Sequence, residues 1–166
     1  MSTLVASTSP NNRSSLFRSS VIGGLIIGML HLIIQAWFVF SFLGKTPFIS
    51  VLQYITSGTM GNAAFEGGRA TALLGVVLEF LMTIIIAGVF ILSADRIPLL
   101  RRHVIVGSLL YGFGVFIVMY VIVLPLSAAP TVPVSTMEVI EIAVEHILLI
   151  GLPLGILMRW NANTNK

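Results

Sequence analysis

Residues 70–93 read ATALLGVVLEFLMTIIIAGVFILS, residues 94–103 read ADRIPLLRRH, and residues 104–127 read VIVGSLLYGFGVFIVMYVIVLPLS. The two outer stretches are 24 residues long and almost wholly apolar, and the middle one is short and basic. A helix needs about 20 apolar residues to cross the hydrocarbon core of a bilayer. The sequence therefore predicts two transmembrane helices joined by a basic turn.

The composition of the whole chain indicates the same class. Of its 166 residues 57% are hydrophobic and 9% are charged, and the mean hydropathy is +1.04, whereas soluble domains carry about 25% charged residues. The chain has no Cys, which excludes disulfides, thiol nucleophiles and thiolate metal sites. The net charge is +3, but the charged residues do not cluster on a soluble face, and no nucleic-acid or nucleotide motif is present. We expect an integral membrane protein with the lipid bilayer as a partner and no nucleic acid.

Two further apolar stretches complete the pattern. Residues 20–43 form a first span, which is too long for a signal peptide and lacks a cleavage site. Residues 136–160 form a last span, which follows a capping box at Ser135-Thr-Met-Glu138 and should kink near Pro153. The predicted fold is all-α: a polytopic, antiparallel four-transmembrane-helix bundle over residues 20–160, with helices at about 20–43, 70–93, 104–127 and 136–160.

The segments outside the spans are polar. Residues 1–19 are rich in Ser, Thr and Asn and are expected to be a disordered cytoplasmic tail, and residues 161–166 a second tail. Between the first two spans, Thr46-Pro47 suits the start of a helix and Gly58 its end. Apolar residues recur there at helical spacing against Ser50, Gln53 and Ser57, which predicts a short amphipathic helix in the membrane interface.

The distribution of Lys and Arg predicts the orientation of the spans. Short cytoplasmic loops carry an excess of these residues. With the N-terminus inside, the cytoplasmic side holds seven of them and the outer side holds two: Arg13, Arg18, Arg96, Arg101, Arg102, Arg159 and Lys166 against Lys45 and Arg69. We expect both termini to lie in the cytoplasm.

Small residues recur four apart in three of the spans. The pairs are Gly24 and Gly28, Ser108 and Gly112, and Gly151 and Gly155. Such pairs allow helices to approach closely in lipid. Packing within one bundle is the favoured interpretation. The alternative is a face for a homo-oligomer or a membrane-protein partner.

Polar residues at membrane depth are the candidate functional residues. They are His31, Gln35, Glu79, Glu141, Glu145 and His146. A charged group near the bilayer centre costs at least about 2.5–3.5 kcal/mol, so such groups face the interior and have partners. At 1.5 Å per residue, the depths of His31, Glu79, Glu145 and His146, counted from the outer ends of their spans, agree within roughly 5 Å. We therefore predict one polar cluster that joins three helices. Glu141 lies one turn further out and is expected to reach the outer headgroups.

This cluster has three possible roles. It can fix the helix register, with its members satisfying one another. It can bind a metal or a haem, for which His31, Glu79, Glu145 and His146 are the candidate ligands, although their spacing matches no diagnostic ligand pattern. It can also be a proton relay or a solute pathway, because intramembrane Glu–His pairs exchange protons.

These roles correspond to three functions. The leading hypothesis is a non-enzymatic membrane protein whose cluster supports the bundle; no catalytic residues are predicted. The first alternative is a metal- or haem-binding redox protein. The second is a proton-linked small-solute permease, which the small size and the lack of internal repeats disfavour unless the chain oligomerises.

Parts of the chain are similar in sequence to a known family. The similar stretches are AAFEGG (63–68), ALLGVVLEF (72–80), ADRIPLLRRHVIVGSLLYG (94–112), VMYVIVLPLSA (118–128) and, more weakly, GLPLGILMR (151–159). With them the chain resembles a family of small, uncharacterised bacterial membrane proteins with four predicted spans. Members tend to carry His-Phe where this chain has Glu79-Phe80. The resemblance implies a four-span fold in the bacterial inner membrane, and it implies no activity.

Overall fold

The computed structural model describes residues 10–42 and 47–164, and within them the chain is helical without a strand. Residues 1–9, 43–46 and 165–166, with the predicted helix start at Thr46, lie outside the described residues. The elements are α1 (Pro10–Phe42), α2 (Phe48–Met60), the 3₁₀-helix η1 (Gly61–Phe65), α3 (Gly68–Arg96), α4 (Pro98–Arg102), α5 (Val104–Ile117), the π-helix η2 (Val118–Val123), α6 (Leu124–Leu126), α7 (Thr136–Glu145), the π-helix η3 (His146–Gly151) and α8 (Leu152–Thr164).

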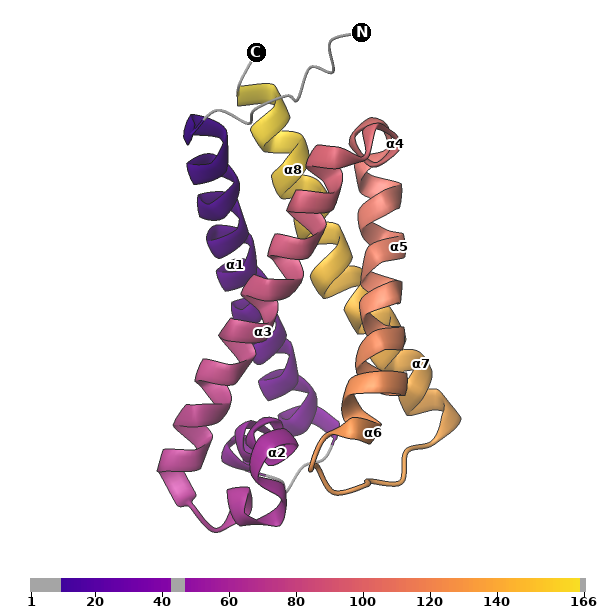
Figure 1. Cartoon of the computed structure of the whole chain (residues 1–166). Coiled ribbons are helices and arrows are strands. Elements are labelled where there is room, and N and C mark those ends of the chain that lie inside the picture. Colours follow the sequence, from indigo (N-terminus) through magenta and orange to yellow (C-terminus); the bar gives the residue numbers. More distant parts are fainter. Residues whose placement is uncertain (1–9, 43–46, 165–166) are drawn as a thin grey trace, which may run out of the picture.

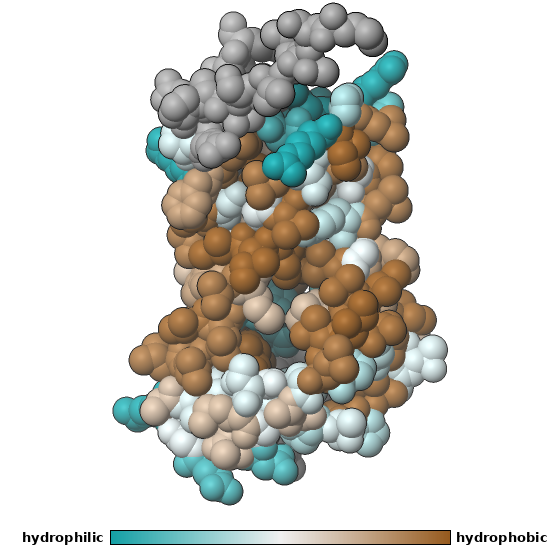
Figure 2. Space-filling model, in the orientation of Figure 1, coloured by the Kyte–Doolittle hydropathy of each residue, from teal (hydrophilic) through white to brown (hydrophobic). Residues whose placement is uncertain are grey.

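Four stretches of helix are long and apolar enough to cross a membrane. They are Ser14–Ala36, Gly68–Arg96, Val104–Leu126 and Thr136–Trp160. The predicted all-α class with four apolar helices is therefore confirmed. Figure 2 shows apolar side chains across the middle of the molecule and hydrophilic ones toward both ends. A surface of this kind suits a protein surrounded by lipid.

The start of the first helix and the end of the last helix differ from the prediction. Helix α1 begins at Pro10 instead of residue 20, so the expected disorder is wrong for residues 10–19. Proline suits the first turn of a helix, where its missing N–H would have no partner. Leu16 also packs against the hydrophobic core, which holds this part of α1 in place. Helix α8 continues to Thr164, so residues 161–164 are helical as well.

The helices pack in two pairs (Figure 1). Helix α1 packs along α3, which also carries α2, and α5 packs along η3 and α8. The start of α1, helix α4 and the end of α8 lie at one end of the molecule, which we call the α4 end. Helix α2, η1 and the extended connector 127–135 lie at the other end, which we call the α2 end. The pairs share a core of buried apolar residues: Ile27, Ala87, Phe90, Ile91, Val115, Ile150 and Leu154.

The small-residue pairs pack within the chain. A Cβ atom on Gly24 would collide with the Ile84 backbone, so α1 and α3 approach closely there. On the other pair, a Cβ on Gly151 would lie 2.6 Å from the Ser108 carbonyl oxygen. Side chains larger than hydrogen would force these helices apart. These glycine faces are therefore occupied by the chain's own helices.

Both π-helical turns lie just before a proline. Turn η2 precedes Pro125 and turn η3 precedes Pro153. Proline lacks an N–H, and its ring clashes with the carbonyl four residues earlier, so a wider turn relieves the clash. The disturbance predicted near Pro153 takes this form. The turn before Pro125 was not predicted.

Helix α2 docks on α3 through its polar side. Its buried residues are Gln53, Thr56 and Ser57. The Gln53 Nε2 donates to the Gly68 carbonyl oxygen at 3.1 Å, and the Thr56 Oγ1 donates to the Thr71 carbonyl oxygen at 2.7 Å. Buried polar groups are stable when they are hydrogen-bonded in this way. The polar positions of the amphipathic pattern thus face the protein.

The C-terminal end of α2 also differs from the prediction. The helix ends at Met60, beyond the predicted stop at Gly58. Gly61, with φ of 60°, has a positive-φ backbone that glycine adopts readily, and its N–H donates to the Ser57 carbonyl oxygen. The Gly58 carbonyl accepts a hydrogen bond from Ala128 N at 3.0 Å, which ties α2 to the connector of the other helix pair. The two pairs therefore also meet at the α2 end.

Tyr111 provides a test of the contact between the pairs. Its hydroxyl donates to the Ile86 carbonyl oxygen at 2.7 Å and so joins α5 to α3. We expect Tyr111→Phe to lower the free energy of unfolding by about 0.6–1 kcal/mol, read from thermal unfolding in detergent. The control is Tyr120→Phe on the same span, because the Tyr120 hydroxyl has no hydrogen bond within the part of the chain that the structure describes. Equal losses in both variants would contradict the prediction.

Candidate functional site

Three spans bring the predicted polar residues to one region. His31 and Gln35 come from α1, Glu79 from α3, Glu141 and Glu145 from α7, and His146 from the start of η3. Because α1 packs along α3 and also contacts η3, the three spans meet at this level. The structure thus brings together helices that are far apart in the sequence.

His31 and Glu79 form the centre of the region. The His31 Nδ1 lies 2.6 Å from the Glu79 Oε1, and this is the one ion pair between side chains of the described residues. Glu79 is 2% exposed. So short a contact is typical of a charge-assisted hydrogen bond. A carboxylate this deeply buried needs such a partner, because an isolated charge in an apolar interior is very costly.

Gln35 extends the pair toward the α2 end. Its Nε2 lies 3.4 Å from the His31 Nε2, one helical turn along the same face of α1. Because the amide nitrogen can only donate, the His31 Nε2 accepts. The proton of a neutral His31 ring is then on Nδ1, where it points at Glu79. Both ring nitrogens of His31 therefore have a hydrogen-bond partner, Nδ1 in Glu79 and Nε2 in Gln35.

His146 adds an aromatic wall. Its Nδ1 donates to the Ile142 carbonyl oxygen at 2.8 Å. Its ring lies edge-on to the rings of His31 and Phe116, with centroid distances of 6.3 Å and 5.8 Å. His146 therefore contacts the central pair through ring packing, and no hydrogen bond links it to Glu79 in the described part of the chain. The ring fixes the position of η3 against α1.

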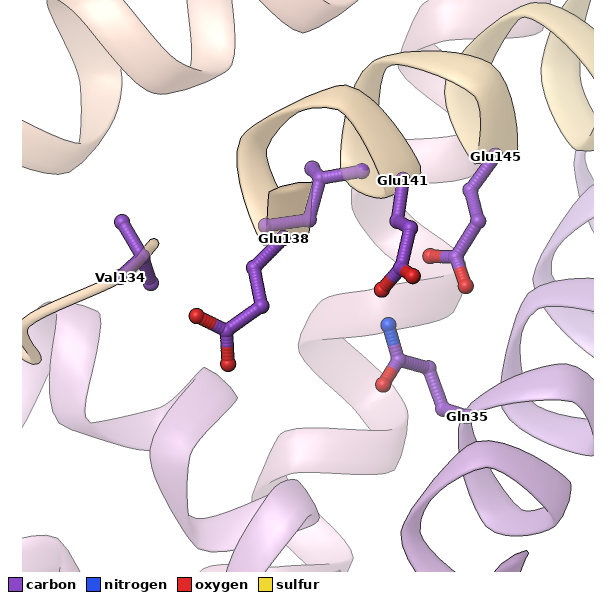
Figure 3. Close-up of a pocket in the computed structure, with 6 residues that line it drawn as sticks. Gln35, Val134, Glu138, Glu141 and Glu145 are labelled. Carbon is purple, nitrogen blue, oxygen red and sulfur yellow. The ribbon is translucent and has the colours of Figure 1, made fainter. Parts of the chain in front are cut away.

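A cleft of about 160 Å³ reaches Gln35, whose amide contacts His31, and neither member of the His31–Glu79 pair lines it. Its lining residues are Gln35, Val134, Glu138, Glu141, Ile142 and Glu145. Figure 3 shows the three carboxylates on one side of α7, with Glu141 and Glu145 directed toward the Gln35 amide. Glu138, Glu141 and Glu145 are three and four residues apart, which places them along one side of the helix. Glu141 lines this cleft as well, and its expected contact with the headgroups stays a prediction.

The outermost carboxylate has a structural task as well. The Glu138 Oε2 accepts from Ser135 N at 2.6 Å, and the Ser135 Oγ accepts from Glu138 N at 3.3 Å. This is the predicted capping box at the start of α7. The backbone hydrogen bond lowers the cost of a charged Glu138 at the mouth of the cleft.

A second opening lies on the face drawn in Figure 2. The surface is hollowed at mid-height, between the apolar side chains of α3 and those of α5 and η2, and the floor of the hollow is hydrophilic. The two helix pairs thus leave a gap within the apolar band.

The described residues do not assemble a cluster of metal ligands. Within residues 10–42 and 47–164, no group of three or more His, Asp or Glu side chains is placed to hold a metal ion. Both nitrogens of His31 already have partners. The cleft of about 160 Å³ is also small beside the roughly 300–1,000 Å³ of pockets that hold drug-sized ligands, and a haem is larger than those.

Sequence reasoning missed one member of the region. Phe116 packs edge-on against His146 and stacks on Tyr120, with ring centroids 5.5 Å apart. The available signal was the recurrence of Phe113, Phe116 and Tyr120 at helical spacing on the third span. An aromatic face of this kind gives no indication of its partner until the neighbouring helix is placed.

Comparisons with protein-family models, with curated proteins and with solved structures gave no match. The resemblance to the bacterial four-span family stays a prediction. The function of the region has to be argued from its geometry and chemistry.

Proposed function

We propose that this chain is a non-enzymatic, multi-pass integral membrane protein in which the His31–Glu79 pair is the proton-binding site of a small-solute permease. The observation that carries the proposal is the 2.6 Å contact between a buried carboxylate and an imidazole that Gln35 links to an open cleft. Ionisable pairs inside the membrane mark proton relays and solute pathways. Imidazole is suited to the task because its unperturbed charge change lies near neutral pH.

Access from one side supports a carrier over a channel. The cleft at the α2 end reaches Gln35, which contacts His31. On the other side of His31, toward the α4 end, the buried side chains of Ile27, Phe90 and Leu154 belong to the core shared by the pairs. A carrier exposes its site to one side of the membrane at a time. In this structure, the proposed carrier is open toward the α2 end.

The pairing of the helices supplies the moving parts. Contacts are dense within the α1–α3 pair and within the α5–α8 pair, and the polar region lies between the two pairs. Alternating access is largely the rocking of one rigid bundle against another around a fixed site. Two pairs within one chain supply such bundles without an internal repeat. A second copy of the chain is an alternative source of the second bundle.

The charges of the two ends support an orientation. Five of the six carboxylates lie on the segments of the α2 half, and Asp95 is the exception. Six of the seven arginines lie on the segments of the α4 end, and Arg69 is the exception. By the excess of positive charge on cytoplasmic loops, the α4 end lies in the cytoplasm and the spans alternate in direction, as an antiparallel bundle in a bacterial inner membrane. The cleft carboxylates then attract a small cationic solute from the outer side.

Proton exchange in proteoliposomes tests the proposal. With a pH-sensitive dye inside, adding tetramethylammonium, sodium or potassium outside should expel internal protons through the wild-type protein. We expect Glu79→Gln to abolish this release, because the neutral amide gives a protonated His31 no anionic partner. The matched control is Glu66→Gln, the same substitution on an exposed residue outside the cluster, which should leave the release unchanged.

Two outcomes would contradict the proposal. One is a wild-type protein that releases no protons with any of the three cations. The other is a Glu79→Gln protein that releases them at the wild-type rate. If Glu79→Gln then lowers the unfolding temperature without changing proton movement, the cluster supports the bundle instead.

A further inference from the structure

Five exposed arginines lie at the α4 end. They are Arg18 on α1, Arg96 on α3, Arg101 and Arg102 on α4, and Arg159 on α8. We call this set the arginine collar. Asp95 is the one carboxylate near it in sequence, and no ion pair engages a collar arginine within the described part of the chain. The collar is therefore a concentration of positive charge that forms no ion pair with a carboxylate of the described residues.

Helix α4 places apolar side chains beside these charges. Ile97 and Leu99 are 46% and 68% exposed, whereas Leu100 packs against the core. Exposed apolar groups next to cations are typical of a segment that lies in the membrane interface, with its apolar side chains among the acyl chains and its cations at headgroup level. The arginines of the collar and the exposed apolar side chains of α4 thus both suit contact with a phospholipid surface.

We propose that the arginine collar binds the phosphate groups of anionic phospholipids. A guanidinium group matches a phosphate with two parallel hydrogen bonds, and an arginine without an acid partner has these donors available. Arg18 and Arg96 belong to the α1–α3 pair, and Arg159 belongs to the α5–α8 pair. Bound headgroups therefore hold the two pairs together at the α4 end. This proposal rests on membrane insertion and does not depend on proton exchange.

Quenching of Trp160 by brominated lipids measures the binding. Trp160 is 70% exposed and follows Arg159 in the chain. In the full-length Trp37→Phe protein in mixed micelles, brominated phosphatidylglycerol should quench Trp160 at lower mole fraction than brominated phosphatidylcholine of the same chain length. One cationic residue near the surface changes the affinity for an anionic surface about fivefold, so Arg101→Gln/Arg102→Gln should lower the phosphatidylglycerol affinity roughly 25-fold.

The control removes the same charge from the other end. Arg69→Gln, at the start of α3, should leave both lipid affinities unchanged. As a second readout, phosphatidylglycerol should raise the unfolding temperature of the wild-type protein more than that of the double variant. Equal quenching by the two lipids, or equal losses in the double variant and in Arg69→Gln, would overturn the proposal. So would displacement of the lipid by millimolar inorganic phosphate, because the ligand would then be a free anion.

Discussion

Replacing His31 with Leu is expected to lower the free energy of unfolding by about 3 kcal/mol, and replacing His31 and Glu79 together with Leu is expected to recover most of that loss. The single change removes the partner of a carboxylate that is 2% exposed. The double change removes the charge along with its partner and leaves two apolar side chains in an apolar surrounding. Pairs of this kind are costly to break and cheap to replace.

The second single variant makes the comparison sharper. Glu79→Leu should cost less than His31→Leu, because imidazole can be uncharged and His31 keeps its contact with Gln35. His103→Leu is the matched control, since His103 is exposed at the α4 end, and its effect should stay within about 0.5 kcal/mol. Thermal unfolding in detergent, followed by circular dichroism, gives the four values. Additive losses at His31 and Glu79 would contradict a direct coupling between them.

The similar depths of His31 and Glu79 in their spans predicted that these two residues are neighbours. His31 and Glu79 are 48 positions apart, and the sequence placed both near the middle of their spans. Since water is absent from the bilayer core, a carboxylate there must have an internal partner, and few groups are able to serve. Burial cost thus limits the pairing strongly. The same reasoning has little force for Glu141, which lies close enough to the interface to be solvated in several ways.

The docking of α2 could not be read from its pattern. A helix with Gln53 and Ser57 on one side looks the same whether that side faces water or the backbone of another helix. What decides the matter is Gly75, which lets α2 approach α3 until side-chain donors reach backbone carbonyls. The pattern of one helix contains no information about the shape of its neighbour. The helix was predicted, and the direction of its polar face was not.

The division into two pairs was beyond the sequence for a related reason. In lipid, the interior and the surroundings of a bundle are equally apolar, so hydrophobicity does not say which helices pack most closely. Small residues carry that information, and the sequence identified them. It did not show that the Ser108 and Gly112 face meets the Gly151 and Gly155 face.

Two glycines on one helix, Gly112 and Gly114, make that interface testable. A Cβ on Gly112 would lie 2.6 Å from the His146 carbonyl oxygen and 3.1 Å from the Gly151 nitrogen. Both are backbone atoms, so neither can move aside without shifting η3. We expect Gly112→Ala to cost about 1–3 kcal/mol in the free energy of unfolding.

Gly114→Ala should have the opposite sign. A Cβ there would meet nothing within 4 Å, so the substitution keeps the packing. Alanine in a helix interior is about 0.5–1 kcal/mol more favourable than glycine, and the variant should be stabilised by up to that amount. Thermal unfolding of the two variants checks the difference. Because the obstructed atom belongs to His146, Gly112→Ala should also displace that ring from His31 and reduce proton release in proteoliposomes. A Gly112→Ala protein as stable as Gly114→Ala would show that α5 and η3 are not in close contact.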